Sequence, residues 1–83
     1  MRITIKYFAS VRESLGISGE AHQTQAPTLA ALRIELIGRG GAYAQSLAHG
    51  RALRMALDQV MSEESAAIAD GAEVAFFPPV TGG

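Results

Sequence analysis

Residues 70–79 read DGAEVAFFPP and combine a turn, a strand and the end of that strand. Asp70-Gly71 is a tight-turn signal. The strand predicted over 73–77 has period two, with Val74 and Phe76 on one face and Glu73, Ala75 and Phe77 on the other. Pro78 and Pro79 have no backbone N–H to donate, so regular pairing is predicted to stop after residue 77. The chain is then expected to leave the sheet as a stiff, polyproline-like stalk.

The first residues predict a second strand with the same period. In residues 2–8, RITIKYF, one face carries Ile3, Ile5 and Tyr7 and the other carries Thr4, Lys6 and Phe8. A short helix is predicted over 10–16, because Ser10 and Glu13 have the spacing of a capping box and Gly16 can end the turn.

The middle of the chain predicts one long helix between weaker strands. Pro27-Thr28 precedes a stripe with helical spacing, in which Thr28 is the N-cap and the apolar positions are Leu29, Leu32, Leu36 and Ile37. Glycines 38, 40 and 41 are expected to end this helix, and 41–50 to be a loop or loose helix. Residues 20–25 are predicted as an edge strand, 51–57 as a third strand, and 58–59 as the turn that leads into 60–61. This order favours an α+β fold, a mixed sheet covered on one face by one main helix.

Composition narrows the class of protein further. A chain of 83 residues with 48% hydrophobic residues suits one compact domain. A net charge of −1 with no basic block argues against a nucleic-acid-binding protein. No stretch approaches the length of a membrane span or a signal peptide, so we expect a soluble, cytoplasmic protein without a membrane partner. There is no Cys, which excludes disulfides and thiolate metal sites.

Other candidate motifs are better explained by structure than by chemistry. The glycine-rich stretch 38–41 lacks the Lys-Ser/Thr of a phosphate-binding loop, so it is interpreted as a helix stop. His22 and His49 lie far apart in the sequence with no Cys nearby, so no metal site is predicted. Glu63-Glu64 is interpreted as a solvated turn. No role is predicted for the arginines at 12, 51 and 54.

The two ends of the chain together resemble a known family. Residues 70–83, DGAEVAFFPPVTGG, look like the C-terminus of the small, sulfur-carrying subunit of molybdopterin synthase, and residues 5–13, IKYFASVRE, resemble its first strand and short helix. Length and element order agree over essentially the whole chain, while 38–64 agree only loosely. The resemblance implies a β-grasp, ubiquitin-like fold, with residues 1–83 as a single domain and 78–83 as its extended tail.

The resemblance also implies the chemistry. An activating enzyme uses ATP and Mg²⁺ to adenylate Gly83, and a sulfur donor converts the adenylate to a thiocarboxylate. The tail enters the large subunit of the synthase, which carries the catalytic residues, and the sulfur passes to a cyclic pyranopterin monophosphate. Two small and two large subunits form the family's heterotetramer, and no cofactor is bound permanently by the small one.

The tail residues suit that chemistry. A carboxylate is a poor electrophile at pH 7, so attaching sulfur to Gly83 requires prior activation. Gly82 and Gly83 lack Cβ atoms, which lets them enter a narrow channel. Pro78 and Pro79 restrict the root of the tail and reduce the entropy lost on insertion. Val80 and Thr81 connect the two parts and are expected to contact the partner.

A partner surface follows if the first and last strands are adjacent and parallel, as in a β-grasp sheet. Ile3, Ile5, Tyr7, Val74 and Phe76 would then join the core, while Phe8 and Phe77 would face the opposite side. We expect these two aromatic side chains to bind the large subunit, with Val60 or Met61 extending the apolar patch.

Three alternatives remain open from the sequence. One is a related carrier that serves thiamine or another sulfur-containing metabolite. Another is a ubiquitin-like modifier that forms isopeptide bonds with lysines through the same activated tail. The third is an interaction module whose tail has no chemical role.

Overall fold

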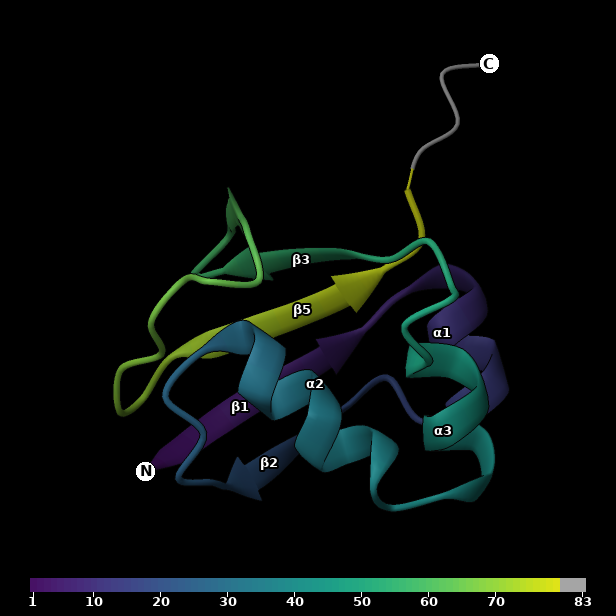
Figure 1. Ribbon diagram of the computed structural model, residues 1–83, viewed down its shortest axis with the longest axis horizontal. Coiled ribbons are helices and arrows are strands. Elements are labelled where there is room, and N and C mark those ends of the chain that lie inside the picture. The colour runs from purple at the N-terminus through teal and green to yellow at the C-terminus, as the bar shows by residue number, and fades with distance from the viewer. Residues whose placement is uncertain (80–83) are drawn as a thin grey trace.

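The computed structural model describes residues 1–79 (Figure 1). Its elements in chain order are β1 Arg2–Tyr7, α1 Ala9–Leu15, β2 Gly19–Gln23, α2 Leu29–Ile37, α3 Gly41–Leu47, β3 Arg54–Leu57, β4 Val60–Ser62 and β5 Glu73–Phe77. Every strand expected from the sequence is present. Residues 41–50, expected to be a loop or loose helix, contain the helix α3.

The strands form one five-stranded mixed sheet in the order β2-β1-β5-β3-β4. The first and last strands lie side by side and run parallel, with Ile5 opposite Val74 and Tyr7 opposite Phe76. The other three pairings are antiparallel. This topology confirms the α+β, β-grasp arrangement expected above, and it places the end of the last strand in the middle of the sheet.

The main helix α2 crosses one face of the sheet (Figure 1) and supplies much of the core. Its stripe residues Leu29, Leu32 and Leu36 are fully buried. Burying a leucine side chain stabilises a fold by about 2 kcal/mol, so this stripe accounts for a substantial share of the hydrophobic stabilisation. The predicted cap is confirmed, because the Thr28 hydroxyl accepts a hydrogen bond from the Ala31 backbone N–H at 3.2 Å.

The predicted cap of the short helix is wrong. The helix begins at Ala9 after an extended Phe8, and no side chain caps it. The backbone N–H of Phe8 still donates to the Phe76 carbonyl at 3.1 Å, so the strand pairing continues to this residue. Ala9 then turns the chain sharply with φ 50°, which places Ser10 inside the helix and not before it. The stop at Gly16 is confirmed, in a left-handed conformation with φ 78°.

One strand near the middle differs from its predicted bounds, and the turn after it is confirmed. The strand expected over 51–57 is regular only from Arg54, because the chain upstream bends and the Arg51 N–H donates to the Ala48 carbonyl. The turn at 58–59 is present with positive φ at both residues, 51° and 68°, the geometry of a type I′ hairpin turn. The later start of the strand arises from a backbone bend that side-chain periodicity does not encode.

No helix in residues 1–79 is long and apolar enough to cross a membrane.

Candidate functional site

The root of the tail lies where the central strand leaves the sheet. β5 ends at Phe77, opposite Arg54 of β3, and the next two residues, Pro78 and Pro79, are half-buried and outside the sheet pairing. The predicted end of pairing is therefore confirmed. The predicted site residues Val80, Thr81, Gly82 and Gly83 lie outside the described residues.

Two aromatic side chains flank this root on the face of the sheet that α2 does not cover. Phe8 is 45% exposed and Phe77 is half-buried. Their rings pack edge to face with centroids 6.4 Å apart, a favourable arrangement for aromatic pairs. The structure thus brings together the two residues that the sequence assigned to a partner surface, although they are far apart in the chain.

The hairpin residue that shares this face is Met61. Met61 is opposite Ala56, which is opposite Ala75, so the side chains of all three lie on the face of Phe77. Val60 is opposite Leu57, which is opposite the buried Val74, so its side chain lies on the helix-covered side of the sheet. Val60 and Met61 are both well exposed, but the register supports only Met61 as an extension of the aromatic patch.

A cavity of about 360 Å³ opens beside the root. It lies among α1, α3 and the segment before β3, and its lining includes Ser10, Ser14, Ser46, Arg51, Leu53, Pro78 and Pro79. The Ser46 hydroxyl donates to the Ser14 hydroxyl at 2.6 Å and joins the two short helices. The root of the tail therefore sits against a partly polar hollow and not on a flat surface.

A buried arginine that sequence reasoning missed holds the segment lining this cavity. Arg33 is 3% exposed, and its guanidinium donates to the carbonyls of Leu47 and Ala48, at 2.7 Å each, and of Arg51, at 3.3 Å. It also pairs with the Glu64 carboxylate at 3.2 Å. These contacts satisfy carbonyls at the end of α3 that have no partner within the helix. Glu64 is therefore part of a structural ion pair, and the interpretation of 63–64 as a solvated turn holds only for the exposed Glu63.

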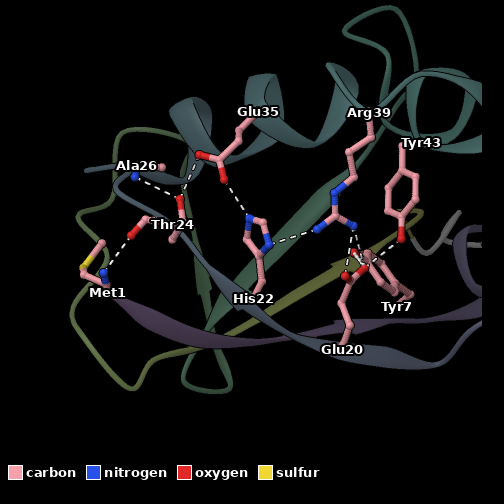
Figure 2. A network of polar contacts seen from close by, with 9 residues as sticks. All are labelled: Met1, Tyr7, Glu20, His22, Thr24, Ala26, Glu35, Arg39 and Tyr43. Atoms are coloured by element: carbon pink, nitrogen blue, oxygen red, sulfur yellow. Dashed lines mark hydrogen bonds and ion pairs between the residues drawn. The ribbon is translucent and has the colours of Figure 1, made fainter.

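A second polar cluster joins β2 to α2 and α3 on the helix-covered face of the sheet (Figure 2). The Glu20 carboxylate accepts hydrogen bonds from the Tyr7 and Tyr43 hydroxyls, at 2.8 Å each, and pairs with Arg39 at 2.9 Å. Arg39 also contacts His22, whose other ring nitrogen lies 2.7 Å from Glu35. The cluster fixes the edge strand against α2 and α3.

Protonation within this cluster follows from burial and hydrogen bonding. Burial opposes ionisation of Glu20, but the hydrogen bonds from Tyr7, Tyr43 and Arg39 outweigh it and hold the pKa of Glu20 below its ordinary value. Burial, followed by the hydrogen bond to Glu20, raises the pKa of Tyr7 and of Tyr43. At neutral pH the cluster therefore contains a charged carboxylate between two neutral phenols.

The histidines do not form a metal site in the described part of the chain. Residues 1–79 contain no group of three His, Asp or Glu side chains placed to hold an ion. His22 is held between Arg39 and Glu35, and His49 is exposed after α3. The glycine-rich stretch lies between α2 and α3, where Gly40 and Gly41 adopt positive φ.

Comparison with known proteins identifies a family and two close relatives. The model of the ThiS family matches residues 5–83. The molybdopterin synthase sulfur carrier subunit of Escherichia coli (strain K12) is 38% identical over 81 residues, which cover 98% of this chain and 99% of that protein. The protein with the same name from Haemophilus influenzae is 35% identical over the same shares of both chains.

Solved structures show the same fold at lower identity. SAMP1 from Haloferax volcanii superposes with a TM-score of 0.76 at 22% identity, and all of both chains is covered. A chain from the complex of subunits 1 and 2 of the molybdopterin-converting factor of Helicobacter pylori gives 0.68 at 20% identity, again with full coverage of both. At these identities the likeness supports the fold alone.

Proposed function

The chain belongs to the ThiS family and, within it, to the sulfur carrier subunits of molybdopterin synthase, and we propose that it carries sulfur on the carboxylate of Gly83. The observation that supports this most is the tail root. The central strand ends at two prolines that cannot extend the pairing, beside an aromatic pair in which Phe8 is exposed and Phe77 is half-buried. This arrangement takes Pro78 and Pro79 out of the sheet pairing, and the aromatic side chains beside them support a docking role for this part of the surface.

The proposed reaction begins with activation of the terminal carboxylate. An oxygen of the Gly83 carboxylate attacks the α-phosphorus of ATP in an activating enzyme, forming an acyl-adenylate and releasing pyrophosphate. A hydrosulfide ion supplied by the donor then attacks the carbonyl carbon and displaces AMP, and loss of the remaining S–H proton leaves a thiocarboxylate. In the activating enzyme, Mg²⁺ neutralises the charge of the ATP phosphates. In this proposal the carrier itself binds neither ATP nor Mg²⁺.

The next step requires a partner with a tail channel. We propose that the large subunit of molybdopterin synthase binds the aromatic patch of Phe8 and Phe77 and receives residues 78–83 in its active site. There the sulfur passes to a cyclic pyranopterin monophosphate in molybdenum cofactor biosynthesis. The complex of the two subunits from Helicobacter pylori supports this pairing, because one of its chains has the same fold. A heterotetramer with two carriers would supply the two sulfurs of the dithiolene.

Mass spectrometry of the intact protein with fragmentation of the tail tests the proposal. The protein, with an untagged C-terminus, is incubated with activating enzyme, ATP, Mg²⁺ and a sulfur donor. We expect one oxygen of Gly83 to be replaced by sulfur, and no change in a variant lacking Gly82 and Gly83. An unmodified tail, with an enzyme that modifies another carrier, would contradict the proposal.

A second experiment distinguishes a sulfur carrier from a protein modifier. A modifier would form isopeptide bonds, which appear as a ladder of conjugates on a blot of cell extract that depends on Gly83. The likeness to SAMP1 extends to the fold and does not by itself favour that activity. We expect the thiocarboxylate without the ladder.

A further inference from the structure

One alanine in the domain has a backbone conformation that hairpin geometry does not explain. Three non-glycine residues within 1–79 have positive φ: Ala9 at 50°, Asp58 at 51° and Gln59 at 68°. Asp58 and Gln59 form the type I′ hairpin turn, which requires positive φ at both central residues. Ala9 instead occupies the first position of α1, where a helical residue has φ of about −63°. Residues with a Cβ avoid the left-handed region, so the surrounding structure must hold Ala9 there.

The residues on either side of Ala9 fix this conformation. Before it, the Phe8 N–H donates to the Phe76 carbonyl at 3.1 Å, which keeps the extended Phe8 paired with β5. The Phe8 carbonyl then accepts the Val11 N–H at 3.1 Å, at the start of α1. After it, the Val11 side chain is 4% exposed and packs in the hydrophobic core, which anchors the helix. Ala9 therefore makes the change of direction between two anchored neighbours within a single residue.

These two neighbours are also two parts of the tail root. Phe8 supplies one ring of the aromatic pair with Phe77. The helix α1 lines the same cavity as Pro78 and Pro79, and Figure 1 shows it beside the end of β5. If Ala9 relaxed to negative φ, the helix and the Phe8 ring would change their relative orientation. Strained residues recur at binding sites, where the strain contributes to pre-organisation.

We propose that Ala9 is a positioning residue for binding of the large subunit. Its left-handed backbone holds the Phe8 ring and α1 in the relative orientation that the partner binds. This inference rests on the proposed function, in which the large subunit binds the aromatic patch. Ala9 acts through its backbone conformation and needs no contact with the partner. The effect of each substitution at this position therefore follows from how well the new residue tolerates positive φ.

Titration calorimetry of the full chain with the large subunit tests this proposal with a matched pair of variants. Ala9→Asn and Ala9→Thr both add a polar side chain, but asparagine tolerates the left-handed region and the β-branched threonine does not. We expect Ala9→Thr to weaken binding about tenfold, as loss of an interface anchor does. Ala9→Asn should stay within about twofold of wild type. Circular dichroism gives the folded fraction of each variant, so that unfolding is not counted as lost affinity.

A double-mutant cycle with Phe8 shows whether the effect acts through the aromatic patch. In the Phe8→Ala background, Ala9→Thr should weaken binding less than about twofold further. If Ala9→Thr does not fold, Val11→Ala tests the same link by loosening the anchor that holds Ala9 in its strained conformation. Val11→Ala should then weaken binding, and adding Ala9→Asn should recover about half of that loss or more, because asparagine favours positive φ locally.

Four results would overturn the role of Ala9. One is a folded Ala9→Thr variant that binds as tightly as wild type, which would indicate a purely structural residue. Another is an equal loss of affinity in Ala9→Asn and Ala9→Thr, which would show that the side chain matters and φ does not. A third is an undiminished effect of Ala9→Thr in the Phe8→Ala background. The fourth is a Val11→Ala loss that Ala9→Asn does not recover. Failure of the wild-type chain to bind the large subunit, or equal binding by wild type and Phe8→Ala, would instead contradict the proposed docking, and the role of Ala9 with it.

Discussion

Replacing Arg33 by methionine should cost about 3 kcal/mol of unfolding free energy. The change leaves the Leu47 carbonyl without its guanidinium donor and leaves the Ala48 carbonyl with the Arg51 N–H alone. The guanidinium donates to the Leu47 and Ala48 carbonyls at 2.7 Å and to the Arg51 carbonyl at 3.3 Å. A hydrogen bond from a charged group contributes about 1.5–3 kcal/mol, and methionine keeps much of the packed volume. Two short bonds therefore give about 3 kcal/mol at the lower limit, while the long third bond adds little.

The ion pair of Arg33 with Glu64 should contribute much less than the carbonyl bonds. The Glu64 side chain is 45% exposed, so solvent screens the pair. We expect Glu64→Gln to cost less than about 1 kcal/mol. Arg12→Met is the matched control for the same substitution at an exposed helical position, with an expected change within about 0.5 kcal/mol.

Urea unfolding followed by circular dichroism measures all three variants at pH 7. For a domain of this size, 3 kcal/mol corresponds to a fall in Tm of roughly 12–24 °C, which thermal unfolding would show independently. The reasoning is refuted if Arg33→Met costs less than about 1 kcal/mol, since the carbonyls would then be satisfied some other way. It is also refuted if Glu64→Gln costs as much as Arg33→Met, since the ion pair would then dominate.

Three further predictions concern other parts of the domain. Glu20→Gln should cost about 1–2 kcal/mol of unfolding free energy at pH 7. Because the pKa of Glu20 in the fold lies below its ordinary value of 4.5, this loss should shrink as pH falls below 4.5. Urea unfolding measured against pH would contradict us if the difference in stability between wild type and variant stayed constant. Gln59→Gly should raise stability by about 1 kcal/mol, because glycine adopts the φ of 68° without strain; an unchanged urea midpoint would count against the type I′ turn. Phe77→Ala should weaken binding to the large subunit at least tenfold in titration calorimetry while the domain stays folded. Val60→Ala, on the other side of the sheet, should not weaken this binding. Equal losses of affinity in the two variants would argue against the aromatic patch.

The elements with clear periodicity were predictable from the sequence. The alternation in residues 2–8 and 73–77 placed Ile5 and Val74 in the core, and Thr28 marked the start of the main helix. The parallel neighbourhood of the first and last strands came from the family resemblance and not from periodicity, and the pairing of Ile5 with Val74 confirms it.

The features that sequence reasoning missed depend on contacts between distant residues. Arg33 lies on the main helix α2, and nothing in its neighbours indicates that its guanidinium binds carbonyls about 14–18 residues away. The cap at Ser10 failed because the sheet pairing of Phe8 with Phe76 fixes where the helix begins. Such tertiary hydrogen bonds override local capping preferences. They also determine the segment that lines the tail root.

The most direct test of sulfur carriage is a single turnover with thiocarboxylated protein, the large subunit and a cyclic pyranopterin monophosphate. The sulfur on Gly83 is followed by mass spectrometry of the tail, and the pterin product is analysed in the same samples. We predict that Gly83 returns to a carboxylate as sulfur appears on the pterin, with two carriers consumed for each dithiolene. A thiocarboxylate that persists beside an active large subunit, or a pterin that gains no sulfur, would contradict the central claim.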